Sequence, residues 1–420
     1  MSHAQTLSLP AAILININIM LGTGVFINTV LLAQHTGVLG GFLYIIAGLL
    51  MLPLVLCIAD LTSKHKEGNF YNFGALLSPF WGFLSAWSYC IAKLASASLS
   101  IHVFATFLKH ILPFLTLPTV VYDCMIITLF VLLNTLHVKT GSRIQYGFIV
   151  MKAIPLLFAV CIGLWKVNLI TIGAPDLIWS GIPVGLPLVL FCFLGFESAC
   201  SLSRHIKNSQ RNAPITILFS FIMVMLLVSA YQFLFYTSVG SALGQQKQYV
   251  DAFPLLIKFL TTQYSQSLTA LFSIAIATSA LGGAYGILYS NMWNFYALAE
   301  HNHLIFSDSI KQLNQHNIPV WCVIIEGIIC FGYVILGTGT QIPLQYTATL
   351  GCIATYTISL VAYFKETKSA LSIIGLSSCM ILFAVCISGF ISTSIIPLIV
   401  LSLILLAGIG MYHVKKMVAH

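Results

Sequence analysis

Long apolar segments separated by short polar loops follow one another along the whole chain. Each segment is close to the roughly 20 residues that an α-helix needs to cross the hydrocarbon core of a bilayer, about 30 Å thick. The pattern predicts twelve membrane-spanning helices, and an even number places both chain ends on one side. The predicted spans cover residues 11–34, 40–61, 81–107, 120–138, 144–165, 184–203, 214–237, 267–298, 318–337, 344–364, 370–390 and 393–414.

Two of these segments contain a weak point. The first holds LGTGVF at residues 21–26, and the sixth holds FCFLGFES at residues 191–198. Each interior glycine costs a helix roughly 1 kcal/mol relative to alanine. Inside a bilayer, unwound backbone is tolerated only where it lines a cavity or is buried in protein. The two weak points therefore predict broken helices that form a site.

The two breaks lie five spans apart, so spans 1–5 and 6–10 can form halves of opposite topology. Inverted-repeat transporters have this arrangement, and their broken helices meet near the bilayer midplane. We expect an all-α polytopic membrane protein with twelve transmembrane helices and a five-plus-five inverted repeat, in which helices 1 and 6 are broken. The repeat would cover about residues 11–165 and 184–364, with additional helices at about 370–414.

The composition agrees with this interpretation. Of the 420 residues, 59% are hydrophobic and 7% are charged, whereas soluble domains have about 25% charged residues. The longest hydrophilic stretches, at about 62–80, 238–266 and 299–317, are too short to fold alone. We therefore expect one transmembrane domain over residues 1–420. Residues 1–10 lack the basic region of a signal peptide, so the first apolar segment is expected to remain as a span.

Basic residues are unevenly distributed between alternate loops. Twelve Lys and Arg residues fall in the loops and tail on the N-terminal side and four on the other side, while Lys93 and Lys152 lie within spans. The positive-inside rule then predicts an integral protein of the plasma (inner) membrane with both termini in the cytoplasm. This topology accounts for the net charge of +8. The basic residues form no face interleaved with aromatic residues, so we expect no nucleic acid as a partner. The apolar spans are expected to contact membrane lipid.

The polar residues do not indicate an enzyme. The eleven cysteines are an odd number, lie mostly in apolar segments and show no CxxC or His/Cys ligand spacing. We interpret them as reduced packing residues. The chain also has no nucleophile and base in a recognisable pattern, and we expect neither a metal nor another cofactor.

Four stretches give the chain a resemblance to the amino acid/polyamine/organocation permease superfamily. LGTGVF resembles the family's unwound glycine-small-glycine segment, and residues 67–74 with Phe83 and Trp87 resemble its glycine-glycine-x-tyrosine loop. FCFLGFES and the loop at 206–214 are similar to the phenylalanine-rich break and the lysine-asparagine-proline-arginine loop that follows it. Residues 296–319 are similar to the loop between spans 8 and 9.

The chain departs from the family pattern at two positions. Asn69 stands where a second glycine is usual, and Ser209 stands where the family usually has proline. These departures indicate a divergent branch. The resemblance implies that a bundle containing spans 1, 2, 6 and 7 rocks against spans 3, 4, 8 and 9.

A broken helix offers partners for both charges of an amino acid zwitterion. Free amides after the first break, at the positive end of a helix dipole, suit the carboxylate. Free carbonyls before the breaks suit the ammonium group. The alternative is that the glycines only form a small-residue packing face. The predicted substrate-binding residues are Met20, Leu21, Gly22, Thr23, Gly24, Cys192, Phe193, Leu194 and Gly195.

Aromatic and acidic residues surround the second break. We expect at least one of its phenylalanines to close over the substrate as a gate, with Phe191 and Phe196 as candidates; core packing is the alternative for any single ring. An acid at this depth is costly unless it is hydrogen-bonded or functional. The resemblance links Glu197 to the proton pathway or to holding the break, which makes it a candidate for coupling or gating, and capping of the second half-helix is a compatible structural role.

Two lysines lie within spans. Lys152, on span 5, resembles the residue that replaces a bound sodium ion between spans 1, 5 and 8 in proton-coupled family members. Because burial disfavours its ammonium form, it can release and regain a proton, and we predict that it couples transport to protons. Snorkelling toward the cytoplasm is the alternative. For Lys93 we expect an ion pair with a carboxylate such as Glu197 or Glu326, the alternative being contact with an anionic substrate.

The sequence as a whole indicates a secondary active transporter that moves amino acids or related amines by alternating access, in symport with protons. Two alternatives remain open. One is an exchanger that swaps one amino compound for another, and the other is a non-transporting amino acid sensor with the permease fold. The oligomeric state and the substrate's side chain have no recognisable signal in the sequence.

Overall fold

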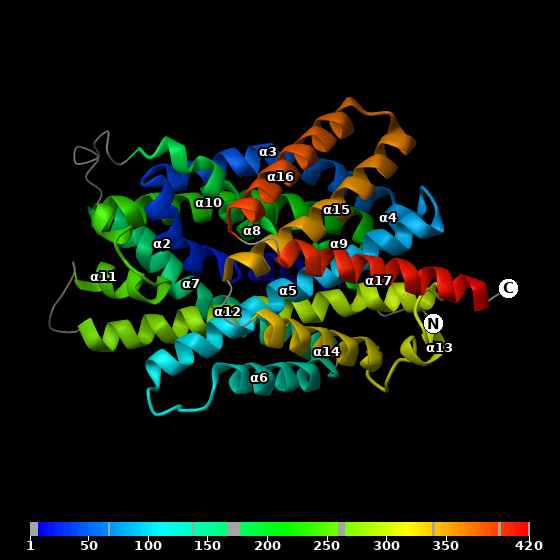
Figure 1. Ribbon diagram of the computed structural model, residues 1–420, viewed down its shortest axis with the longest axis horizontal. Coiled ribbons are helices and arrows are strands. Elements are labelled where there is room, and N and C mark those ends of the chain that lie inside the picture. Colours follow the sequence, from blue (N-terminus) through cyan, green and yellow to red (C-terminus); the bar gives the residue numbers. More distant parts are fainter. Residues whose placement is uncertain are drawn as a thin grey trace.

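The computed structural model describes residues 7–65, 68–136, 138–166, 177–258, 265–337, 341–393 and 396–418. Long helices run mostly along the longest axis of the molecule (Figure 1). Apart from two isolated bridges, the described residues contain no β-structure. The α-helices are α1 (Leu9–Met20), α2 (Gly24–Thr36), α3 (Leu39–Lys64), α4 (Phe70–Ala75), α5 (Pro79–Ile111), α6 (Thr119–Asn134), α7 (Val138–Lys166), α8 (Ile182–Phe193), α9 (Ser198–Ser201), α10 (Ser209–Val239), α11 (Ala252–Lys258), α12 (Ser265–Glu300), α13 (Ser307–Ile310), α14 (Val320–Gly337), α15 (Gln341–Thr367), α16 (Ala370–Thr393) and α17 (Ile396–Val418).

Each predicted apolar segment coincides with a helix or with a pair of helices. Within the described ranges, nine helices are long and apolar enough to cross a membrane, and α1 with α2, bent by 41° at their break, makes a tenth. The remaining two segments form shorter apolar helices, α6 and the Val320–Leu336 part of α14. The all-α polytopic fold is confirmed, and the exact number of twelve spans stays a prediction.

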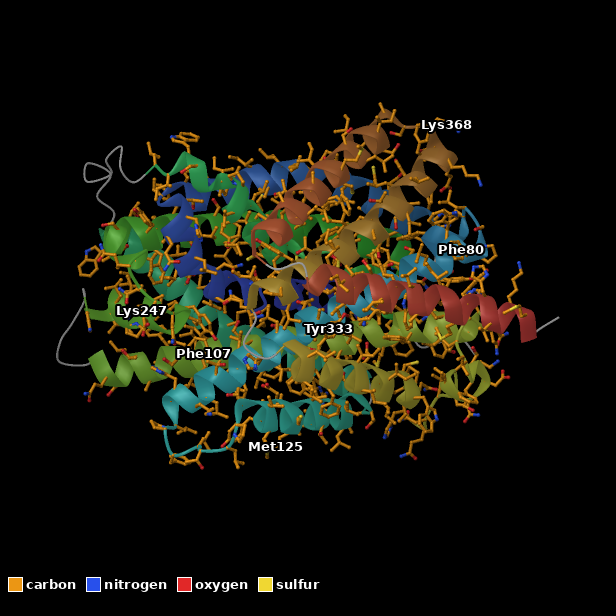
Figure 2. All side chains as sticks on the ribbon, viewed as in Figure 1. Phe80, Phe107, Met125, Lys247, Tyr333 and Lys368 are labelled. Carbon is orange, nitrogen blue, oxygen red and sulfur yellow. The ribbon has the colours of Figure 1, made fainter. Side chains whose placement is uncertain are left out.

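Large apolar side chains cover the outside of the bundle. Met125 on α6 is 61% exposed, Leu336 on α14 is 78% exposed and Met380 on α16 is 73% exposed. Figure 2 shows Met125 at the outer edge of the molecule. An apolar surface of this kind is unfavourable in water and suits contact with lipid chains.

The loops predicted to share the N-terminal side lie together at one end of the molecule. The backbone amide of Leu7 donates to the carbonyl of His205 at 2.9 Å. His65 Nε2 lies 3.4 Å from Glu366 Oε2. In Figure 1, α4, α13 and the end of α17 lie at this end, and α11 lies at the opposite end. This arrangement agrees with spans that alternate in direction.

The two departures from the family pattern lie at helix starts. Asn69 caps α4, because its Oδ1 accepts a hydrogen bond from the backbone amide of Asn72 at 2.9 Å. A glycine at position 69 would lack this acceptor. Ser209 is the first residue of α10, and it follows Asn208, which has a left-handed backbone conformation with φ 50°.

Equivalent members of the two predicted halves pack against each other. Helix α3 packs along α10, and α5 packs along α12. These pairs correspond to spans 2 and 7 and to spans 3 and 8. A five-plus-five repeat would bring such pairs together, although the repeat itself stays a prediction. Between them, α1 contacts α7, α10 and α12, which places the first break at the centre of the bundle.

Candidate functional site

The two predicted breaks are present and lie in contact. Helix α1 ends at Met20 and α2 begins at Gly24, while four residues separate the end of α8 at Phe193 from the start of α9 at Ser198. Gly195, in the second break, has φ +122°, and a Cβ atom there would lie 3.2 Å from the backbone nitrogen of Met20. A Cβ atom on Gly24 would lie 2.9 Å from the sulfur of Cys192. Glycine at both positions therefore lets the two breaks meet.

The start of α2 carries unpaired amides. The first backbone hydrogen bonds of α2 run from the amides of Phe26 and Ile27 to the carbonyl of Thr23, at 3.0 and 3.1 Å. Within the described ranges, the amides of Gly22, Thr23 and Gly24 donate to no carbonyl. These amides lie at the positive end of the α2 dipole. The first break thus has the anion-binding arrangement that the sequence predicts.

Neighbouring helices enclose the first break. Thr23 is 2% exposed, and its Oγ1 lies 3.1 Å from Ser100 Oγ on α5. On the α12 side, a Cβ atom on Gly283 would lie 3.0 Å from the Cα of Gly22. The segment is therefore held between α5, α8 and α12.

Unpaired carbonyls lie beside these amides. In the described part of the chain, the carbonyls of Met20, Leu21, Cys192 and Leu194 accept no hydrogen bond, whereas that of Phe193 accepts one within the turn. An ammonium group suits such acceptors because it is a donor only. The two breaks together offer partners for both ends of a zwitterion.

Glu197 is fully buried and holds the second break together. Its Oε2 accepts from the backbone amide of Gly195 and its Oε1 from the hydroxyl of Tyr89, both at 2.9 Å. Lys93 Nζ lies 3.4 Å from Glu197 Oε1, with the two side chains 1% and 0% exposed. The structural ion pair expected for Lys93 is present, and its partner is Glu197 rather than Glu326.

Asn16 takes the capping role that the sequence analysis gave to Glu197. The side chain of Glu197 makes no cap hydrogen bond to α9. Instead, the backbone amide of Ala199 donates to Asn16 Oδ1 at 3.0 Å, and Asn16 Nδ2 donates to the carbonyl of Phe196 at 2.9 Å. Sequence reasoning missed Asn16, because an asparagine within an apolar run does not reveal which distant backbone it contacts.

Lys152 points into the bundle and does not snorkel toward the surface. The side chain is fully buried, and its Nζ donates to the carbonyl of Asn18 at 2.6 Å. The side-chain amide of Asn18 donates to the carbonyl of Gly282 at 3.1 Å and to Gln145 Oε1. Lys152 thus lies where α1, α7 and α12 meet, which are the helices of spans 1, 5 and 8.

The three phenylalanines of the second break have different surroundings. Phe193 and Phe196 are fully buried, and their rings lie 5.3 and 5.8 Å from the ring of Phe221 on α10. Phe191 borders the first break, since a Cβ atom on Gly24 would lie 2.8 Å from its ring. Of the three rings, Phe191 is therefore the one placed against the substrate-binding segment.

Asn28 connects the helices on the other side of the breaks. Its Nδ2 donates to the carbonyl of Leu188 on α8 at 2.9 Å, and its Oδ1 accepts from Gln345 on α15 at 3.0 Å. The sequence analysis did not single it out. All predicted site residues are buried except the partly exposed Gly22, so the site is enclosed in this structure.

Comparisons with known proteins identify the family of the chain. A family model described as amino acid permease matches residues 7–404, nearly the whole chain. The chain belongs to the amino acid permease family. The permease is 24% identical to the methylthioribose transporter of Bacillus subtilis (strain 168) over 401 residues, which cover 87% of this chain and 82% of that protein.

Two further relatives carry related names. The aromatic amino acid transport protein AroP of Salmonella typhimurium (strain SL1344) is 20% identical to the permease over 346 residues, covering 78% of this chain and 71% of that protein. An uncharacterized amino acid permease, YtnA, of Bacillus subtilis (strain 168) is 22% identical over 394 residues, covering 87% and 80%. The resemblance to the amino acid/polyamine/organocation superfamily is confirmed, and the permease is an integral membrane transporter rather than an enzyme.

The ion pair at the second break gives a prediction about stability. Removing one partner of a buried pair leaves an uncompensated charge and costs about 3–5 kcal/mol. We expect Lys93→Met to destabilise the permease by this amount. The double variant Lys93→Met/Glu197→Gln should recover most of the loss, because the neutral amide can still accept from the backbone amide of Gly195 through its oxygen and donate to the hydroxyl of Tyr89 through its nitrogen. Unfolding by denaturant in detergent measures both. A double variant as unstable as the sum of the single variants would contradict the account.

Proposed function

We propose that the permease is a secondary active transporter of amino acids or related amines in the plasma (inner) membrane, with both termini in the cytoplasm. It works by alternating access and carries its substrate in symport with a proton. The observation that carries the proposal is the contact between the two breaks, one of which has unpaired amides at 22–24 and the other unpaired carbonyls at 192 and 194.

The charges around the breaks favour a zwitterion. The charges of Lys93 and Glu197 compensate each other within the protein, so the second break has no spare carboxylate for an ammonium group. The substrate carboxylate then binds the amides of the first break, and its ammonium group binds the carbonyls at Met20, Leu21 and the second break. Backbone groups alone supply both contacts, so the site accepts the part that all amino acids share.

Lys152 supplies the coupling. Its ammonium group donates to the carbonyl of Asn18, two residues before the end of α1. The carbonyls proposed to bind the ammonium group of the substrate also lie at the ends of α1 and α8. A proton on Lys152 strengthens the contact between α7 and α1, because a charged donor forms a stronger hydrogen bond than a neutral one. Proton binding and substrate binding therefore favour the same position of α1.

Alternating access requires the contacts between the rocking bundle and the other helices to break and re-form. Two such contacts join the breaks to α5: Thr23 with Ser100, and Glu197 with Tyr89 and Lys93. Phe191, beside the first break, closes over the substrate as a gate. Glu197 contacts the backbone of the second break at Gly195 and the side chains of Tyr89 and Lys93 on α5. These contacts therefore couple the shape of the second break to the position of α5.

Transport in proteoliposomes tests the proposed function. We expect uptake of a radiolabelled amino acid into empty vesicles to rise several-fold when an inward proton gradient is imposed, and a protonophore to abolish the rise. The physical reason is that the proton gradient drives the substrate through the shared cycle. Uptake that occurs only when the vesicles already contain substrate would identify an exchanger instead. Binding without any uptake or exchange would identify a sensor.

The role of Lys152 has a separate test. We expect Lys152→Ala to remove the dependence of uptake on external pH, so that the ratio of rates at pH 6 and pH 8 falls to about one, while counterflow exchange remains measurable. Lys258→Ala, which removes an exposed lysine on α11, is the matched control and should keep the wild-type ratio. A Lys152→Ala variant with the full pH dependence would refute the coupling proposal.

A further inference from the structure

A cleft of about 450 Å³ opens at the end of the bundle to which we assign the cytoplasm. Three separate segments form it: the start of α5, the turn after α12 and the end of α17. Figure 2 labels Phe80, which lines this cleft, at the same end of the molecule as the terminus of α17. The polar side chains in its lining are those of Ser78, His301, Asn302, His303, Tyr412, Lys415 and Lys416.

The cleft carries positive charge that no acidic side chain of the described residues pairs with. Among the described residues, neither Lys415 nor Lys416 forms an ion pair. Asp308 is paired with Lys311 at 2.6 Å, and this pairing, with a smaller contribution from Lys415, lowers the pKa of Asp308. Burial and the neighbouring His301 lower the pKa of His303 to about 4, so His303 is neutral at pH 7. The positive charge of the cleft therefore comes from its two lysines.

Other lysines at this end already have partners. Lys64 lies 2.8 Å from Asp60, and the Nζ of Lys365 donates to the carbonyl of Leu76 at 3.3 Å. The Nζ of Lys368 lies over the ring of Phe364, 5.2 Å from the ring centroid, which is within the range of a cation–π contact. The positive-inside rule accounts for all of these lysines alike. It does not account for two lysines that face a cleft without an ion-pair partner in the described part of the chain.

The start of α5 adds to the attraction for an anion. This helix of 33 residues begins with Ser78 as its cap and Pro79 in its first turn, and both residues line the cleft. The positive end of the helix dipole therefore faces the same space as the lysines. This partial charge stabilises a negative group near the start of a helix.

An apolar groove of about 430 Å³ adjoins the cleft. It lies between the start of α5 and the end of α15, and it is lined mainly by Leu77, Trp81, Ile358 and Val361. Ser78 lines both the groove and the cleft. Trp81 is 42% exposed, and tryptophan is enriched at the level of lipid headgroups. A ligand that fills both spaces needs an anionic head and an apolar chain.

We propose that this end of the permease binds an anionic glycerophospholipid. Its phosphate lies in the cleft between Lys415, Lys416 and the start of α5, and an acyl chain lies in the groove beside Trp81. Free phosphate would fit the charge of the cleft, but it would leave the adjoining groove without an occupant. The lipid links α5 and α15 to the end of α17, which packs against both helices. This inference does not depend on the transported substrate.

Competition binding tests the proposal on the purified full chain in a neutral detergent. The probe is fluorescent phosphatidylglycerol, and the competitors are unlabelled phosphatidylglycerol, phosphatidylcholine and inorganic phosphate. We expect only phosphatidylglycerol to compete well. Lys415→Gln/Lys416→Gln should weaken binding about ten- to thirty-fold, since each lysine near a lipid surface contributes to attraction for anionic headgroups. Val361→Trp, which fills the groove, should also weaken binding.

The control is Lys207→Gln/Arg211→Gln. It removes two exposed positive charges, four residues apart, at the end of the helix bundle to which we assign the cytoplasm. We expect it to leave binding nearly unchanged. Wild-type affinity in the Lys415/Lys416 variant, or an equal loss in the control, would overturn the proposal. Competition by inorganic phosphate with no effect of Val361→Trp would show a phosphate site instead. If the double variant does not fold, Lys415→Gln and Lys416→Gln singly provide the same test with smaller shifts.

Discussion

Unpaired peptide groups in a membrane protein are the constraint on which this structure depends. Hydrocarbon offers them no partner, so each must be satisfied inside the protein or line a site. The chain breaks two helices and brings the breaks into contact. Asn16 and Glu197 satisfy part of the second break, and the first break keeps its amides free. The remaining unpaired groups are those that a zwitterion can satisfy.

The distribution of charge follows from the same constraint. A buried charge is tolerated when it is paired and hydrogen-bonded. Lys93 and Glu197 compensate each other at the second break, with Tyr89 as an additional donor. Lys152 has no carboxylate partner among the described residues and donates to a backbone carbonyl of α1. This difference explains why one buried lysine is structural and why we assign proton coupling to the other.

The sequence predicted the features that depend on local patterns. Apolar length and glycine placement located the helices and both breaks, and the depth of Lys93 predicted an ion pair. Asn16, Asn28 and Tyr89 were missed, because their roles depend on segments more than a hundred residues away in the chain. Capping of α9, the structural alternative for Glu197, falls to Asn16 for the same reason: a carboxylate beside a break has several amides within reach, and Glu197 accepts from the amide of Gly195.

The central claim is that backbone groups of the two breaks bind both ends of a zwitterion. Isothermal titration calorimetry with one bound amino acid, its methyl ester and its N-acetyl derivative tests this most directly. The account predicts that each derivative binds at least about tenfold more weakly than the amino acid, because the ester lacks the carboxylate that pairs with the amides at 22–24 and the N-acetyl derivative lacks the ammonium group that pairs with the carbonyls. Equal affinity for all three compounds would contradict it.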